Sequence, residues 1–147
     1  MTENRNNNFK YRRRVEFADT DMAGIVHFAN FFRFMEEAEH AYYRFLGIPI
    51  HPPGAENTFG WPRVHVECDY KKPARFEDVL DIYVAVVNIR EKTIQHAITI
   101  CRRENSEIVE IAVGNIIAAC VSYNEKEKWM KAIPIPTVIR DKFVSAS

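Results

Sequence analysis

Apolar residues recur every three or four positions between residues 29 and 46, and this spacing predicts one long amphipathic helix. The apolar stripe of the predicted helix consists of Phe31, Phe34, Met35, Ala38, Ala41, Tyr42 and Phe45. Gly47 follows the last turn and Pro49 comes soon after it, so we expect Gly47 to cap the C-terminus of the helix. The stripe should face the core of the protein.

Most of the remaining chain shows the patterns of β-strands. A first strand is predicted at residues 11–18, before the helix. Three later segments alternate between apolar and polar residues and a further one is almost continuously apolar; these are residues 64–70, 80–86, 94–100 and 108–123. Gly114 is predicted to mark a β-bulge in the last segment. One apolar helix against one antiparallel sheet predicts a two-layer α+β domain.

The length of 147 residues favours a single domain. We expect residues 1–10, which are polar and rich in Asn, to form a flexible N-terminal segment, and residues 11–147 to form the domain. The chain shows no apolar run typical of a signal peptide or of a membrane span, which predicts a cytoplasmic protein. One sheet on one helix leaves the sheet edges uncovered, and this predicts a homo-oligomer.

Charge and cysteine content exclude several classes of function. Lys and Arg number 20 together, as do Asp and Glu, so the net charge of zero gives no support for binding to nucleic acids or membrane surfaces. The three cysteines are far apart and form no Cys-x-x-Cys pair. We therefore predict no metal site, and we expect reduced thiols packed as small apolar residues.

The candidate chemistry lies between the first strand and the long helix. Asp19 and Asp21 stand where the strand ends, Gly24 follows, and the helix begins a few residues later. Free backbone N–H groups at a helix start can bind an oxyanion, and a carboxylate nearby can attack a carbonyl or activate water. A thiolate, with a pKa of about 8.5, leaves without a general acid, so this combination suffices for a thioester. Asp19 is expected to bond loop amides in a structural role.

This stretch resembles the active-site signature of the 4-hydroxybenzoyl-CoA thioesterase family of hotdog-fold enzymes. The residues that fill the signature are Arg14, Val15, Thr20, Asp21, Gly24, Ile25, Val26, Phe28 and Phe31. Residues 68–78, with the sequence CDYKKPARFED, form a second element similar to the family's, and the Pro-Ile-Pro segment before a short C-terminal helix is also similar. The resemblance therefore spans nearly the whole chain.

The resemblance implies a hotdog fold, in which an antiparallel β-sheet wraps around one long central α-helix. It implies hydrolysis of an acyl-CoA thioester, with Asp21 as the nucleophile or general base and the backbone N–H of Phe28 polarising the carbonyl. Gly24 allows the loop to approach the substrate closely. Coenzyme A belongs to the substrate, so no cofactor is expected. The family implies dimers or dimers of dimers, hence a homotetramer, with active sites between subunits.

Four further residues are assigned to substrate binding. His27 is expected to line the acyl site, and Glu36 corresponds to an acidic residue that meets the polar end of an aromatic acyl group in the family's namesake branch. Family members meet the CoA phosphates with basic residues in a hairpin turn, which here contains Arg90 and Lys92. Each assignment has a structural alternative: a packing or hydrogen-bonding histidine for His27, an exposed helix glutamate for Glu36, and solvated basic side chains for the turn. Another hotdog branch uses a helix glutamate as catalyst, which keeps Glu36 and Glu37 as alternatives.

Other functions compete with hydrolysis of an acyl-CoA. A hydratase or dehydratase of the same fold uses a His and an acid in motifs that this sequence lacks. A serine hydrolase is disfavoured because no Gly-x-Ser-x-Gly motif occurs. A non-hydrolytic protein that binds CoA or an acyl-CoA is the remaining alternative, and the sequence leaves the identity of the acyl group open.

Overall fold

The computed structural model describes residues 9–50, 57–124, 126 and 128–146. The predicted flexible segment therefore lies outside the described residues, except for its last two positions, which belong to a strand. Along the chain the elements are β1 (Phe9–Arg14), the 3-10 turn η2 (Phe17–Asp19), α1 (Asn30–Leu46), β2 (Asn57–Gly60), β3 (Arg63–Tyr70), β4 (Val79–Ile89), β5 (Thr93–Glu104), β6 (Glu107–Ala119), β7 (Val121–Asn124), β8 (Trp129–Ala132) and α2 (Thr137–Ala146).

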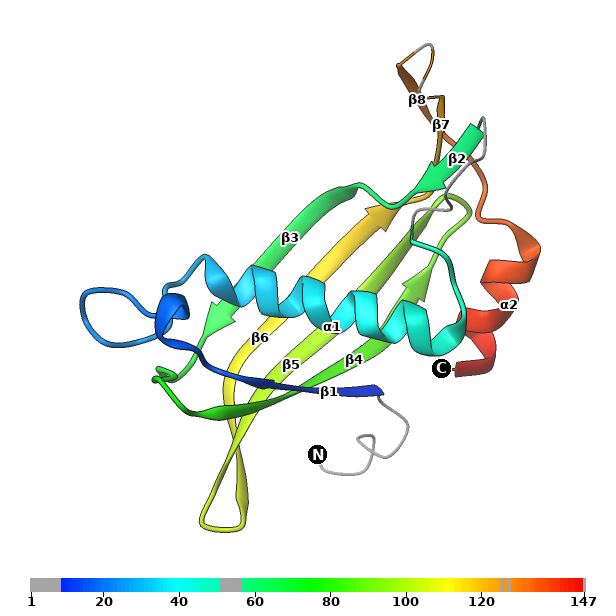
Figure 1. The fold of residues 1–147 in the computed structure, drawn as a ribbon. Helices are drawn as coiled ribbons and strands as arrows, with labels where there is room; N and C mark the ends of the chain where they lie inside the picture. The colour runs from blue at the N-terminus through cyan, green and yellow to red at the C-terminus, as the bar shows by residue number, and fades with distance from the viewer. Residues whose placement is uncertain (1–8, 51–56, 125, 127, 147) are drawn as a thin grey trace.

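The predicted architecture, an antiparallel sheet around one long helix, is confirmed. A five-stranded sheet has the strand order β1-β4-β5-β6-β3, and β2, β7 and β8 form a small second sheet. Every pair in the large sheet is antiparallel. Helix α1 crosses one face of this sheet, with its N-terminus near the end of β3 and its C-terminus near α2 (Figure 1). The start of α1 and the end of β3 thus meet at one side of the molecule.

The core lies between α1 and the large sheet. Its helix side consists of the buried side chains Phe31, Phe34, Met35, Ala38, Tyr42 and Tyr43, and its sheet side is built mainly from apolar residues of β4, β5 and β6. Gly47 caps α1 in the left-handed conformation, as predicted, with φ of 70°. Phe45 was wrongly predicted to face the core. Its side chain lies at the sheet edge, where the ring of Phe9 covers only part of it, and it is 71% exposed.

Three strand predictions differ from the structure. The predicted strand at residues 108–123 is divided into β6 and β7, which belong to different sheets. The first strand ends at Arg14 instead of residue 18, because residues 17–19 turn into η2 and direct the chain away from the sheet. Residues 57–60, which were placed in a loop, form β2 and pair with β7. Strand β3 has the predicted alternation, but it is an edge strand, and Val64 and Val66 remain 60% and 44% exposed.

Gly114 does not mark a bulge. It pairs regularly with Ile98 on β5, and the irregularity between β5 and β6 lies instead between Ile100 and Cys101. A Cβ atom at Gly114 would lie 2.5 Å from Sδ of Met35 and 2.8 Å from the backbone oxygen of Glu67. Glycine is therefore needed here because α1 packs closely onto β6.

Replacing Gly114 by alanine should lower the free energy of unfolding by about 1–3 kcal/mol, since the added methyl group overpacks the contact between α1 and the sheet. Urea-induced unfolding at one fixed protein concentration measures this change. Gly60→Ala is the matched control, because its Cβ would meet only Cγ2 of Val121, at 3.9 Å. Equal losses in the two variants would contradict the close-packing explanation.

Candidate active site

The segment between η2 and α1 folds back on itself in a tight turn. The N–H of Asp21 donates to the carbonyl of Ile25 at 2.8 Å, and the N–H of Gly24 donates to the carbonyl of Asp21 at 3.0 Å. Gly24 has φ of 80°, and a Cβ added there would meet nothing within 4 Å. Glycine is favoured at this position by the backbone conformation and not by lack of space.

The Asp21 carboxylate is oriented by the turn that it opens. Its Oδ1 accepts hydrogen bonds from the N–H groups of Ala23, at 2.9 Å, and Ile25, at 3.4 Å. Among the described residues, no hydrogen bond reaches Oδ2 of Asp21. The side chain is half-buried, so one oxygen is held by the backbone while the other is available to a ligand.

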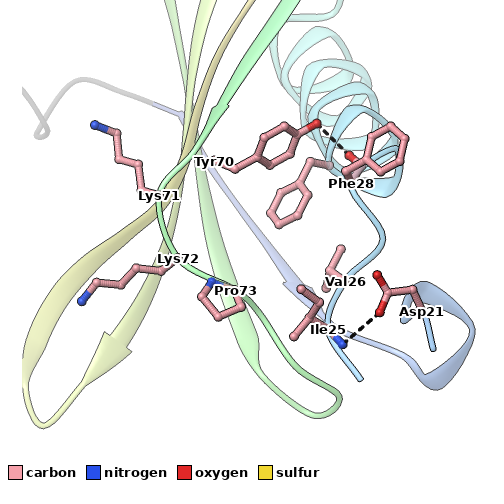
Figure 2. Close-up of a pocket in the computed structure, with 9 residues that line it drawn as sticks. Asp21, Ile25, Val26, Phe28, Tyr70, Lys71, Lys72 and Pro73 are labelled. Atoms are coloured by element: carbon pink, nitrogen blue, oxygen red, sulfur yellow. Dashed lines mark hydrogen bonds between the residues drawn. The ribbon is translucent and has the colours of Figure 1, made fainter. Parts of the chain in front are cut away.

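Asp21 lies at the wall of a pocket of about 410 Å³. The pocket is bounded by the loop before α1 and by the segment that follows β3 (Figure 2). Its lining is Asp21, Ile25, Val26, Phe28, Phe31, Tyr70, Lys71, Lys72 and Pro73, most of which are apolar. A pocket of this size, mostly apolar but with one carboxylate and two lysines in its lining, is suited to a small apolar group next to a reactive centre.

Phe28 brings a backbone donor to the same pocket. It stands two residues before the start of α1, where the first N–H groups of a helix lack partners within the helix. Within the part of the chain that the structure describes, the N–H of Phe28 makes no hydrogen bond. Its carbonyl, in contrast, accepts a hydrogen bond from the hydroxyl of Tyr70 at 2.9 Å. The pocket therefore combines a carboxylate with an unpaired amide at the positive end of a helix.

His27 is adjacent to this site, and the structure gives it a local role. Its Nδ1 accepts the N–H of Ala29 at 3.1 Å, and its ring stacks on that of Phe28 with centroids 4.5 Å apart. Its side chain does not line the pocket. These contacts place His27 as a support for Phe28 and for the start of α1.

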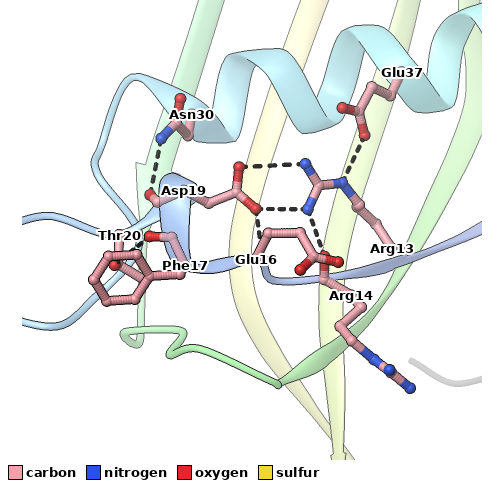
Figure 3. A network of polar contacts seen from close by, with 8 residues as sticks. All are labelled: Arg13, Arg14, Glu16, Phe17, Asp19, Thr20, Asn30 and Glu37. Carbon is pink, nitrogen blue, oxygen red and sulfur yellow. Dashed lines mark hydrogen bonds and ion pairs between the residues drawn. The ribbon is translucent and has the colours of Figure 1, made fainter.

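A polar network fixes the chain just before Asp21 (Figure 3). The Asp19 carboxylate accepts the guanidinium of Arg13 at 2.6 Å and the N–H of Glu16 at 2.8 Å. The Asp19 carbonyl accepts the side-chain amide of Asn30, at the start of α1, at 2.8 Å. Burial alone would raise the pKa of Asp19, but the hydrogen bond and charge of Arg13 outweigh it and hold that pKa below its usual value. This geometry agrees with the structural role expected for Asp19.

The remaining predicted site residues lie away from the pocket within one chain. Glu36 is exposed on α1 and does not line it, and Glu37 pairs with Arg13 at 3.1 Å on the β1 side. Arg90 and Lys92 lie in the turn between β4 and β5, at the opposite end of the sheet from the Asp21 loop (Figure 1). A single chain therefore brings together Asp21, Gly24 and Phe28, but not the residues predicted to bind the CoA phosphates.

Tyr70 is a pocket residue whose contact the sequence analysis missed. The sequence pointed to it only as part of residues 68–78, the second segment that resembles the thioesterase family. Its ring packs edge-on against Phe31, with centroids 5.2 Å apart, and its hydroxyl reaches Phe28. The alternation along β3 puts Tyr70 on the same face of the strand as Val66 and Cys68, but it does not indicate which residue the hydroxyl contacts.

The family model of the thioesterase-like superfamily matches residues 15–143 of this chain. The chain belongs to this superfamily. A protein of Aquifex aeolicus is 39% identical over 79 residues, which are 52% of this chain and 59% of that protein. The 1,4-dihydroxy-2-naphthoyl-CoA hydrolase of a Picosynechococcus species is 34% identical over 129 residues, which cover 86% of each chain.

A solved structure shows that the likeness extends to the fold. A variant of 4-hydroxybenzoyl CoA thioesterase in complex with 4-hydroxybenzoyl CoA superposes with a TM-score of 0.82, at 21% identity, over 92% of this chain and 98% of that one. The predicted family and the predicted hotdog fold are thereby confirmed. The superfamily's match begins at Val15, so it includes the whole turn around Asp21.

Two further features of this superfamily member concern metals and membranes. Among the described residues, no three His, Cys, Asp or Glu side chains come close enough together to hold a metal ion. No helix in the described part of the chain has the length and apolar character needed to cross a membrane.

A second polar cluster lies under the middle of α1, away from Asp21. The buried Glu39 pairs with Arg63 at the start of β3, and its Oε2 has no hydrogen-bond partner among the described residues. Burial raises the pKa of Glu39 to about 7 despite the opposing charge of Arg63. The hydroxyl of Tyr43 lies 2.9 Å from Nε2 of His96, whose pKa burial lowers to about 3. His96 is thus a neutral core residue.

Glu39 should make folding stability depend on pH. Its pKa in the folded state exceeds the value near 4.5 expected for the unfolded chain, so the contribution of Glu39 to stability is fully present below pH 4.5 and is lost as the pH rises to about 7. Between pH 5 and pH 8, Glu39→Gln should gain about 3 kcal/mol relative to the natural protein, measured by urea unfolding. Glu107→Gln, exposed at the start of β6 and away from Glu39, is the control and should follow the natural protein. Parallel pH curves for Glu39→Gln and the natural protein would refute the effect.

Proposed function

We propose that this protein hydrolyses an acyl-CoA thioester in the pocket beside Asp21. One observation carries the proposal: an oriented carboxylate and an unpaired backbone N–H, from Asp21 and Phe28, border the same small apolar pocket. Hydrolysis of CoA thioesters is also the activity named for the relatives that share this fold. The geometry and the family thus support the same chemistry.

In the proposed reaction, the thioester carbonyl oxygen accepts the N–H of Phe28, which stabilises the negative charge that develops there. Either Oδ2 of Asp21 adds to the carbonyl carbon, or it removes a proton from a water molecule that adds instead. In both routes the C–S bond breaks and its electron pair leaves on the CoA thiolate. Attack by Asp21 forms a mixed anhydride, which water then hydrolyses; the products are a carboxylic acid and CoA.

The substrate follows from the pocket lining. Phe28, Phe31 and Tyr70 offer ring surfaces to the acyl group, while the reaction needs only the thioester and water. We therefore propose that the protein acts without a cofactor, the CoA being part of the substrate. A cytoplasmic location fits this substrate and remains a prediction.

We further propose that the working unit is a homodimer formed by antiparallel pairing of the two β3 strands. Strand β3 is one of the two edge strands of the large sheet, and its Val64 and Val66 are exposed there. Such an apolar edge favours pairing with a second strand. A dimer of two such dimers, the predicted homotetramer, needs a second interface and remains a prediction.

This pairing would bring the separated substrate-binding residues to the pocket. The start of β3 pairs with the end of β6, and the end of β6 pairs with the start of β5. Because β5 begins directly after the β4–β5 turn, this turn lies at the same end of the sheet as the start of β3. In an antiparallel β3 pair, the turn with Arg90 and Lys92 from one subunit therefore lies toward the Asp21 pocket of the other. The CoA phosphates would then be met by these two residues of the partner.

Asp21→Asn should reduce turnover at least about 100-fold, because an amide can still accept the N–H of Ala23 but can neither attack the carbonyl nor take a proton. Release of free thiol from a panel of acyl-CoA thioesters measures turnover, and calorimetry measures thioester binding, which should persist. Asp141→Asn is the control, since it removes the same charge from an exposed position on α2, away from the pocket. Natural turnover in Asp21→Asn would reject the assignment, and binding without thiol release by the natural protein would favour a non-hydrolytic role.

Val66→Lys should break the proposed dimer, because it puts a charge into an apolar strand-to-strand contact. Light scattering after size exclusion should give a lower mass for this variant than for the natural protein, and turnover should fall with it. Val138→Lys, at an exposed apolar site on α2, should keep both mass and turnover. A fully active natural protein that runs as a monomer would rule out the dimer proposal.

A further inference from the structure

The loop that carries the proposed oxyanion donor is tied to the end of β3 at two levels. Near its middle, the N–H of Val26 donates to the carbonyl of Ala74 at 2.8 Å, and Ile25 bridges to Arg75. Nearer to α1, the hydroxyl of Tyr70 donates to the carbonyl of Phe28 at 2.9 Å. The second tie is a single side-chain hydrogen bond, and it falls on Phe28, whose N–H is unpaired among the described residues.

The position of Phe28 explains why this tie matters. Phe28 stands just before Ala29, the N-cap of α1, so its carbonyl lies outside the hydrogen bonds of the helix. The N–H of Phe32 donates to the carbonyl of Ala29, at 3.2 Å. In the described part of the chain, Tyr70 is the one donor found for the carbonyl of Phe28. The backbone of Phe28 is thus held by β3 and not by α1.

The side chain of Tyr70 is 47% exposed, and its ring has a contact of its own in the pocket. Its ring packs edge-on against that of Phe31, with centroids 5.2 Å apart, and both rings line the pocket. Burial raises the pKa of Tyr70 above its usual value, and the neighbouring Cys68 acts in the same direction. The hydroxyl therefore keeps its proton and remains a hydrogen-bond donor at neutral pH.

We propose that Tyr70 is the positioning residue for the oxyanion site: its hydrogen bond to the carbonyl of Phe28 fixes the backbone of that residue, so that the Phe28 N–H points at the thioester carbonyl. This inference rests on the proposed function. Tyr70 touches no reacting atom in this account, and its effect reaches the substrate through Phe28. Because an oxyanion donor acts mainly on the transition state, losing its alignment should lower kcat more than it raises KM.

Tyr70→Phe tests the proposal, since it keeps the ring against Phe31 and removes only the hydroxyl. We expect kcat to fall about tenfold, a smaller loss than the 100- to 1,000-fold typical of deleting an oxyanion donor, while KM changes less than about twofold. Tyr123→Phe, on β7 and away from the pocket, is the matched control and should keep the natural kcat. Thermal unfolding of both variants shows whether folding is intact.

A spectroscopic measurement separates positioning from a merely structural role. A CoA ketone analogue, in which a methylene group replaces the thioester sulfur, keeps the carbonyl and cannot be hydrolysed. Its carbonyl stretching frequency should fall on binding to the natural protein, because the Phe28 N–H donates to it, and should fall less on binding to Tyr70→Phe.

The outcomes are distinguishable from failure of the proposed function. If the natural protein releases no thiol from any acyl-CoA, the proposed hydrolysis fails, whatever Tyr70 does. If the natural protein is active and Tyr70→Phe retains its kcat and its carbonyl shift, the positioning role is overturned. A fall in kcat that is accompanied by a smaller carbonyl shift supports it.

Discussion

The hydrogen bonds that fold the chain back between η2 and α1 are the constraint on which the rest of the structure depends. They hold Oδ1 of Asp21 against the backbone of Ala23 and Ile25 and leave Oδ2 for a ligand. The same short loop ends at Phe28, whose N–H is unpaired among the described residues. A carboxylate and an amide donor that are seven residues apart in sequence are thereby brought to one pocket without any contribution from distant catalytic side chains.

The surrounding fold serves to anchor this loop on both sides. On the β1 side, Arg13 pairs with Asp19, and Asn30 ties the start of α1 to the same aspartate. On the β3 side, the carbonyl of Ala74 accepts the N–H of Val26, and the hydroxyl of Tyr70 donates to the carbonyl of Phe28. The close packing of α1 on the sheet at Gly114 sets the position of the helix between these anchors. Catalysis by positioned groups requires this kind of rigidity, because small displacements of the donor reduce its effect on the transition state.

Much of this could be predicted from local sequence pattern, and the rest depends on contacts between distant residues. The period of α1, its cap at Gly47 and the turn around Asp21 and Gly24 are encoded within a few neighbouring positions. The bond from Tyr70 to Phe28 joins residues 42 positions apart, so no local pattern reveals it. Phe45 fits the helical stripe but lies at the sheet edge and is exposed. Its position depends on the tertiary packing and not on the local pattern.

A crystal structure of the Asp21→Asn variant with a bound acyl-CoA tests the central claim most directly. The account predicts that the thioester carbonyl oxygen lies within hydrogen-bond distance of the Phe28 nitrogen. It also predicts that the side chain of residue 21 lies about 3–3.5 Å from the carbonyl carbon, or from a water molecule placed to attack it. A thioester bound with its carbonyl turned away from Phe28, or outside the pocket, would contradict the account.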